Sequence, residues 1–305
     1  MKKAWLPVLT LLLAILWGCA VAPPESPPQV DTGVDPNEWV RIPAGEFLYG
    51  MHNKEAVIEK DFEMMLTPVT NAQFAAYLNE ALAKGELILN EDGVYIEYPG
   101  EPFEGGKHEV EYGPGQYLVY PLGTIEAKLE YKGGQFVVKP GWENHPVTMT
   151  TWFSGWGYCR FYGGRLPTEK EWEKAARGED GRPYPWGEEI TKAHANFYKS
   201  GDPFDHYWGG QGETTPVGFY NGETHLGFKT EKAVSPYGLY DMAGNVWEWM
   251  LDTEEHNPHL HYTHQRILKG GAFNNYDYDA RTFARNFAPP DYYDFTTGFR
   301  CVREP

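Results

Sequence analysis

Apolar residues recur at helical spacing in three stretches, and each stretch begins with a threonine that can cap a helix. After Thr70, Gln73 completes a capping box, and Gly85 lies where such a helix would end. The apolar stripe between them consists of Phe74, Tyr77, Leu78 and Leu82. This spacing predicts a helix over residues 70–85.

Two further helices are predicted in the middle of the chain. Residues 151–162 form the second, which stops before a Gly-Gly pair. The third opens with Thr168 and its capping-box partner Glu171, and it ends at Gly178. Its apolar side is expected to hold Trp172, Ala175 and Ala176.

Alternating apolar and polar residues predict strands elsewhere. Residues 39–50 alternate around a Pro-Ala-Gly turn and are expected to form a hairpin. Residues 87–138 also read as strands, with a second hairpin turning at Gly133-Gly134. Within them, one face is expected to carry Ile125, Ala127, Leu129 and Tyr131. After residue 184 the helical period disappears, which predicts long packed loops and an α+β fold overall.

The first residues have the layout of an export signal. Lys2 and Lys3 precede an apolar run over residues 4–17 that is too short to span a bilayer. The sequence Leu-Trp-Gly-Cys that follows resembles a lipobox, in which Cys19 takes the lipid. The alternative is an ordinary cleaved signal peptide. A lipidated Cys19 would attach the protein to a membrane through its lipid alone.

This organisation divides the chain into three parts. Residues 1–18 are expected to be the signal, and residues 19–38 a proline-rich tether held extended and away from the surface. Residues 39–305 are expected to form the folded domain. Because alanine rather than aspartate follows Cys19, the outer membrane or the cell surface is favoured as the location within the cell envelope.

Charge and cysteine content narrow the partners and the compartment. The formal net charge of −17 argues against nucleic acid as a partner, because both would be polyanions. With Cys19 lipidated, Cys159 and Cys301 remain in an oxidising compartment. They can form one disulfide, which a chain-entropy argument values at roughly 4 to 5 kcal/mol for so long a loop. The alternative is two buried free thiols.

Two loops rich in oxygen ligands could hold calcium. In the first, Asp241 and Glu248 flank a turn at Gly244 whose carbonyls can point inward. The second runs from Asn196 to Asp205. Either loop could equally be an ordinary turn with acidic residues.

Four histidines crowd another loop, and imidazoles at such spacing could hold zinc or copper. They are His256, His259, His261 and His264. The alternative is one face of an exposed strand. The chain has neither a Gly-x-Ser-x-Gly nucleophile elbow nor a GxxxxGK phosphate loop.

Residues 272–297 have an unusual composition. They are rich in Tyr, Phe, Asn, Asp and Thr, and they contain no Lys, Glu, Gln, Met or Trp, all of which the rest of the chain uses. Aromatic rings offer contact area at little entropic cost, and the small polar residues add adaptable hydrogen bonds, as in a binding surface. The alternative is an irregular, aromatic-rich part of the core.

Over residues 39–304 the chain resembles the formylglycine-generating enzyme family, also called the sulfatase-modifying factor domain. The motifs that carry the resemblance are VRIPAGEFLYG, PVTNAQFAAYL, HPVTMTTWFSGWGYCRFYGGRLPTEKEWEKAARG, YPWG, TTPVG, SPYGLYDMAGNVWEWM, LKGGAF and GFRCV. The resemblance implies a C-type-lectin-like fold with few helices, short strands and much irregular loop. It also implies a disulfide between Cys159 and Cys301.

The resemblance further implies structural calcium, as one or two ions. The ligands implied for the first ion are Asp241, the Gly244 and Val246 carbonyls and Glu248. Those implied for the second ion are Asn196, the Phe197 carbonyl, Asp202 and Phe204. The loop after Asn196 is shorter here than in the enzymes, which weakens the case for the second ion.

The catalytic site of that family is altered in this chain. Enzyme members bind copper through two cysteines, whose thiolates also drive oxidation of a substrate cysteine. The matching positions here are Asn275 and Ala280, and Ala272 replaces a serine common in the family. No copper is expected, and formylglycine generation by the known mechanism is not expected.

Residues 272–297 also resemble the variable region of retroelement-diversified proteins, which use the same fold. There, randomised adenines turn AAC-type codons into Asn, Asp, Tyr, Phe, Thr, Ala, Pro or Arg, and every residue of this segment belongs to that set. The alternative is an inactive relative whose site has drifted. The side chains expected to contact a protein or glycan ligand are Phe273, Asn275, Tyr276, Tyr278, Phe283, Asn286, Phe287, Tyr292, Tyr293 and Phe295.

The preferred hypothesis is a non-enzymatic surface lipoprotein that binds a ligand through this segment. A fixed scaffold in an envelope assembly belongs to the same class. The competing hypothesis is a divergent enzyme, a metal-dependent oxidase that uses the histidine loop.

Overall fold

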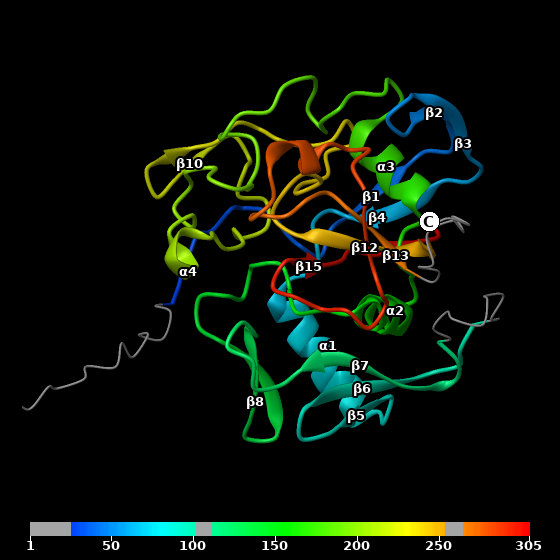
Figure 1. The fold of residues 1–305 in the computed structure, drawn as a ribbon, viewed down its shortest axis with the longest axis vertical. Helices are drawn as coiled ribbons and strands as arrows, with labels where there is room; N and C mark the ends of the chain where they lie inside the picture. Colours follow the sequence, from blue (N-terminus) through cyan, green and yellow to red (C-terminus); the bar gives the residue numbers. More distant parts are fainter. Residues whose placement is uncertain (1–25, 102–111, 254–264) are drawn as a thin grey trace, which may run out of the picture.

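A computed structural model describes residues 26–101, 112–253 and 265–305 (Figure 1). Its helices are α1 (Asn71–Ala83), α2 (Trp152–Phe161), α3 (Glu169–Arg177) and α4 (Tyr207–Gly210), with the 3-10 turn η1 (Asp277–Ala280). Its strands are β1 (Trp39–Ile42), β2 (Gly45–Tyr49), β3 (Lys54–Ile58), β4 (Phe62–Met65), β5 (Leu87–Leu89), β6 (Gly93–Tyr98), β7 (Gly115–Pro121), β8 (Leu129–Lys132), β9 (Gln135–Val138), β10 (Thr224–His225), β11 (Phe228–Lys229), β12 (Trp247–Thr253), β13 (Arg266–Lys269), β14 (Asn286–Ala288), β15 (Thr297–Gly298) and β16 (Val302–Arg303).

The three predicted helices are confirmed, and each begins at its threonine cap. Thr70 accepts a hydrogen bond from the Gln73 amide and Thr168 one from the Glu171 amide, and both glutamine and glutamate close the capping box in return. Thr151 opens α2 in the same way with Ser154 as its partner. These local hydrogen bonds satisfy amides that the first turn of a helix leaves unpaired.

The central sheet has the order β14-β13-β12-β15, in which β15 runs parallel to β12 and the other pairs are antiparallel. In Figure 1, α3 and α2 lie on opposite sides of β12 and β13, and both helices contact β12. A second sheet, β1-β4-β16, joins the beginning of the domain to its end. The remaining strands form hairpins and a three-stranded sheet, β5-β6-β7, below α1.

Two hydrophobic clusters make up most of the core. The larger one joins α1, α2 and β5 to β7, and it contains Phe74, Tyr77, Phe153 and Trp249. The smaller one packs α3 against β1, β4 and β13 around Trp172. The loops after α3 also contribute to the core, since Leu239 and Met242 belong to the smaller cluster and Phe299 to the larger one.

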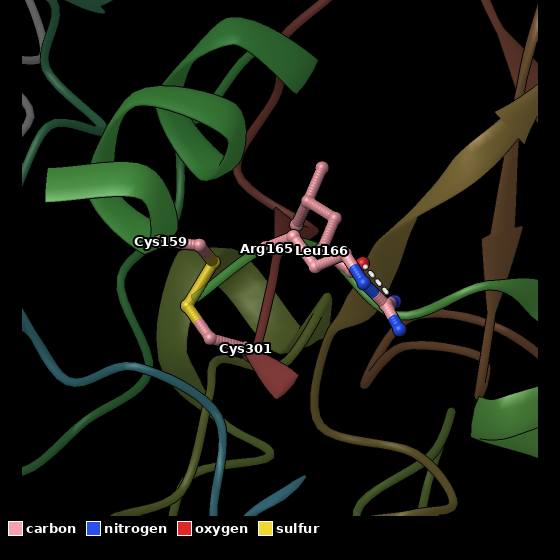
Figure 2. The surroundings of a disulfide bond; sticks show 4 residues. All are labelled: Cys159, Arg165, Leu166 and Cys301. Carbon is pink, nitrogen blue, oxygen red and sulfur yellow. Dashed lines mark hydrogen bonds between the residues drawn. A yellow bond between two sulfur atoms is a disulfide. The ribbon is translucent and has the colours of Figure 1, made fainter. Parts of the chain in front are cut away.

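Cys159 and Cys301 form a disulfide with Cα atoms 5.5 Å apart (Figure 2). It joins α2 to the residue before β16 and closes a loop of 142 residues. Backbone hydrogen bonds in both directions between Arg165 and Val302 support the same junction, at 2.9 and 2.8 Å. The covalent link therefore closes the loop that contains residues 272–297.

Two strand predictions are wrong. Residues 39–50 do form two strands, but β1 pairs with β4 and β2 with β3, so they are not a hairpin. The stretch from residue 125 becomes a strand only at Leu129, and the expected alternation fails. Ile125 and Tyr131 are exposed by 54% and 41%, whereas Lys128 is buried in an ion pair with Glu213. The hairpin turn at Gly133-Gly134 is present as predicted.

Residues 27–38 do not stand away from the domain as a tether. Thr32 donates from its hydroxyl to the Val217 carbonyl at 2.9 Å and accepts at its own carbonyl from Asn221 at 3.0 Å. Val30 packs beside the buried rings of Phe219 and Tyr220. We call residues 27–38 the N-terminal strap. In the described part of the chain, no helix is long and apolar enough to cross a membrane.

Candidate functional site

The C-terminal segment leaves β13 through Gly270 and Gly271 and returns over its own start. Gly271 has φ +75, and a Cβ there would come within 2.9 Å of the backbone of Asp279. Only glycine allows this close approach at positive φ. The two glycines therefore place η1 directly over the beginning of the segment.

Asn275 and Ala280, the positions matching the catalytic cysteines of the enzymes, hold a well-packed turn. The Asn275 side chain accepts a hydrogen bond from Trp247 Nε1 at 2.9 Å, and its carbonyl accepts one from the Tyr198 amide at 2.7 Å. Ala280 is buried against Tyr184 and Ala243. Neither residue offers a soft ligand, and Cys159 and Cys301 are paired elsewhere.

The structure exposes only part of the predicted contact set. Tyr276, Tyr278 and Tyr292 are exposed by 57%, 52% and 43%. Asn286 is also exposed, and Asn275 and Phe283 are half-buried. These side chains remain candidates for contact with a ligand.

Other members of the predicted set belong to the core. Phe273 is fully buried, so its prediction as a contact is wrong: its ring packs against Phe295 at 5.9 Å between centroids. Tyr293 and Phe295 are partly buried against the larger cluster, and Phe287 against the smaller one. Aromatic residues of this segment thus serve both the core and the surface.

The exposed residues divide into two regions rather than one continuous face. Tyr276 and Tyr278 flank the start of η1, the short orange helix in the upper part of Figure 1. The region around Tyr292 lies beside α2, where the Pro290 carbonyl accepts from the Trp152 amide at 3.0 Å. Asp291 also accepts from the Tyr112 hydroxyl at 3.0 Å.

Sequence reasoning missed the framework residues that complete these regions. Tyr198 packs edge-on against Tyr276, with centroids 5.4 Å apart. A cavity of about 430 Å³ lies between residues 183–190 and the side chains of Arg281 and Phe283. No local pattern in the sequence could join these segments, because only the folded loops bring them together.

The loop from Asp241 to Glu248 fits a cation in part. Burial, together with the nearby Glu248 carboxylate, raises the pKa of Asp241 to about 6. This is the response expected of a carboxylate that lacks a full counter-charge. Glu248 is fully buried and already holds Arg300 through both oxygens and Trp172 through one. Asp241, with the nearby carbonyls, is therefore the side chain with the greater need for an ion.

The second predicted loop fits a metal less well. Asp202 is buried and accepts three hydrogen bonds, from the Phe204 amide, the Ser200 hydroxyl and the Tyr220 hydroxyl, at 2.7 to 2.8 Å. These bonds occupy both carboxylate oxygens and lower the pKa of Asp202, although burial, the largest effect, still raises it above its ordinary value. Asn196 lies next to the first loop, since its carbonyl accepts from the Asn245 amide at 2.8 Å.

The four histidines from His256 to His264 lie outside the described residues. Within residues 26–101, 112–253 and 265–305, no group of three or more His, Cys, Asp or Glu side chains is placed to hold a metal ion. A site built from one or two carboxylates and backbone carbonyls, as at Asp241, is of a different kind.

Comparisons with known proteins agree with this architecture. A family model for the sulfatase-modifying factor enzyme 1-like domain matches residues 25–305. The formylglycine-generating enzyme of Thermomonospora curvata is 32% identical over 324 residues, covering 93% of this chain and 97% of that protein. The inactive C-alpha-formylglycine-generating enzyme 2 of Mus musculus is 30% identical over 291 residues, covering 86% and 84%.

A longer relative and two solved structures complete the comparison. The serine/threonine-protein kinase pkn1 of Chlamydia caviae is 30% identical over 286 residues, 87% of this chain and 38% of that protein, so the chain spans under two fifths of its length. PvdO from Pseudomonas aeruginosa superposes with a TM-score of 0.56 at 22% identity, covering 88% and 94% of the two chains. Treponema denticola variable protein 1 gives 0.54 at 18%, covering 88% and 95%. At these identities the likeness shows a shared fold, which confirms the predicted fold class.

Proposed function

Because the chain belongs to the sulfatase-modifying factor enzyme 1-like domain family, we propose that it uses this fold to bind a ligand at the cell envelope through a diversified C-terminal segment. The observation that carries the proposal is the composition of residues 272–297, in which every residue is reachable from randomised AAC-type codons. Asn275 and Ala280 in place of the copper-binding cysteines support a binding role over formylglycine generation.

The framework suits a surface that varies in sequence. The segment is held at both ends by buried strands, β13 before it and β15 with the disulfide after it. Rigid supports of this kind let exposed side chains change without loss of the fold. The name of Treponema denticola variable protein 1, which shares the fold, supports the same role for this chain.

Lipid attachment at Cys19 and calcium at Asp241 are further parts of the proposal. The lipid would hold the protein at the outer membrane or the cell surface, and one calcium ion would hold the loop before β12. Incorporation of labelled palmitate into the protein, and its loss in Cys19→Ala, tests the attachment. If the wild-type protein incorporates no labelled palmitate, lipid attachment at Cys19 is excluded.

The diversification is tested by deep sequencing of the gene across many cells of one population. We expect substitutions to concentrate in codons 272–297, at positions that are adenines in a nearby near-identical repeat. The framework codons on either side, for residues 266–271 and 298–302, serve as the internal control. Variation spread evenly over the gene, with no such repeat, would leave a fixed scaffold and exclude a diversified one.

A further inference from the structure

The most exposed aromatic rings of the variable segment form an ordered array with a framework residue. Tyr276 and Tyr278 stack with centroids 5.7 Å apart and planes 17° from parallel. Tyr198 meets Tyr276 edge-on at 5.4 Å. We call Tyr198, Tyr276 and Tyr278 the tyrosine array.

We propose that the tyrosine array, with Asp277 and Asp279 beside it, binds an arginine or lysine side chain of a protein partner. The inference rests on the proposed function and names the ligand class for this variant of the segment. Such a site needs an aromatic surface whose rings are already in position and carboxylates that are not paired with cations of the same chain. It must also bind a cation more tightly than a neutral ligand.

The array is held in place from beneath. The Tyr198 amide donates to the Asn275 carbonyl at 2.7 Å, so the framework loop and the variable turn are joined directly. Trp247, the first residue of β12, donates to the Asn275 side chain at 2.9 Å. The rings therefore keep their positions although Tyr276 and Tyr278 are more than half exposed. Exposed rings in a fixed arrangement bind at little entropic cost.

Two aspartates bring negative charge to the array, and neither takes part in a salt bridge within the described residues. Asp277 lies between the two stacked tyrosines in the sequence, and Asp279 follows one residue after Tyr278. Burial is the largest effect on the pKa of Asp279 and raises it, and repulsion from Asp277 raises this pKa further. Hydrogen bonds from Asn275 and the Tyr276 amide act in the opposite direction. A cation placed here would relieve this repulsion.

One ring of the array already lies near a cation of the same chain. The Lys199 amino group lies 5.0 Å from the centroid of the Tyr198 ring, at the edge of the array. Cations are attracted to the negative face of an aromatic ring, and arginine also stacks on it. A neutral sugar could stack on the same rings and donate its hydroxyls to the aspartates, but it would not offset their negative charge. The formal net charge of −17 further favours approach of a basic surface.

The test uses two short peptides and the full mature chain. One peptide is acetyl-Gly-Arg-Gly-Arg-Gly-amide, and the other carries citrulline, which has the same shape without the charge, at both arginine positions. Titration calorimetry at low salt is expected to show binding of the arginine peptide and binding at least about tenfold weaker for the citrulline peptide. Equal affinity for the two peptides would overturn the proposal.

Variants locate the site. Tyr276→Ser and Asp277→Asn should each weaken the arginine peptide at least about fivefold. The matched controls are Tyr131→Ser, which removes an exposed tyrosine on β8, and Glu130→Gln, which removes one exposed charge beside it. Both controls should bind as the parent does. Similar losses in all four variants would mean non-specific attraction to an acidic protein and would overturn the site.

The outcomes also separate this inference from the proposed function. Binding of a neutral oligosaccharide that requires Tyr276, without binding of the arginine peptide, would overturn the cationic class while supporting a binding role for the segment. Evenly spread codon variation would remove diversification and leave the peptide result unaffected.

Discussion

At the scale of single residues, His145 is a buried base that should make the fold sensitive to acid. Its ring is 1% exposed, and Nδ1 lies 2.9 Å from the Thr214 hydroxyl. Burial, with the nearby Lys128 cation, lowers the pKa of His145 to about 3. An unfolded histidine titrates near 6.5. Between these values the unfolded chain binds more protons at this residue, so the contribution of His145 to the free energy of unfolding falls by about 2 kcal/mol from pH 7 to pH 5.

The prediction is tested with urea unfolding of the parent protein and His145→Gln at both pH values. The variant should be less stable at pH 7, because it loses a packed ring, and it should lack the part of the pH dependence that His145 supplies. His52→Gln, which changes an exposed histidine, should keep the full dependence. The same change with pH in the parent and in His145→Gln would contradict the prediction.

Single residues also show why the exposure of side chains in residues 272–297 could not be predicted. Phe273 and Tyr276 are both aromatic and reachable by diversification, yet one is fully buried and the other is exposed by 57%. The difference arises because Phe273 lies under Gly212, a residue far away in the sequence. The position of Arg285 also depends on a distant residue, because its side chain pairs with Glu169 of α3 at 2.8 Å. Contacts of this range leave no local pattern.

At the scale of elements, the sequence predicts what local hydrogen bonds determine. The helices began at Thr70, Thr151 and Thr168 because a capping box lies within four residues of chain. Strand pairing is different, because β1 and β2 are adjacent in sequence but each finds a partner elsewhere. For the calcium loops, the motifs predicted which residues could be ligands. They did not predict that Arg300 already neutralises the carboxylate of Glu248.

The loop from Asp241 to Glu248 makes a prediction about calcium. Without calcium, Asp241→Asn should be neutral or stabilising, because burial, with a smaller effect of Glu248, disfavours the charged form of Asp241 and raises its pKa. With calcium at 100 times its Kd, the parent should gain about 2.7 kcal/mol and Asp241→Asn much less. Calorimetric melting in calcium and in EGTA measures both effects.

Two other substitutions show whether the effect is specific to Asp241. Glu248→Gln should destabilise the protein in both conditions, because it disrupts the buried pair with Arg300, so it does not report on calcium. Asp202→Asn should likewise lower the melting temperature equally with and without calcium. A full calcium response in Asp241→Asn would place the ion elsewhere, and no calcium response in the parent would exclude the ion.

At the scale of the whole molecule, the N-terminal strap changes how the protein would sit at a membrane. Pro27 lies against Gly141, which has no room for a side chain there. If Cys19 carries a lipid, the eight residues that follow it, up to Pro27, can span at most about 28 Å. The domain would then be held close to the lipid surface rather than at the end of a long tether.

The strap should also contribute to the stability of the domain. Val34 occupies the space above Gly218, Thr32 bonds to Val217 and Asn221, and Gln73 of α1 donates to the Pro36 carbonyl at 3.0 Å. Partial burial of the two valines and these hydrogen bonds, less the cost of ordering the strap, should amount to about 1 to 3 kcal/mol. A chain that begins at residue 39 should therefore unfold at lower urea concentration than one that begins at residue 26. The chain that begins at residue 26 should be as stable to urea as the mature protein. Val34→Ala in that chain should lower the stability by part of the difference between the two shortened chains. If the two shortened chains unfold at the same urea concentration, the strap adds no stability and residues 26–38 behave as a free tether.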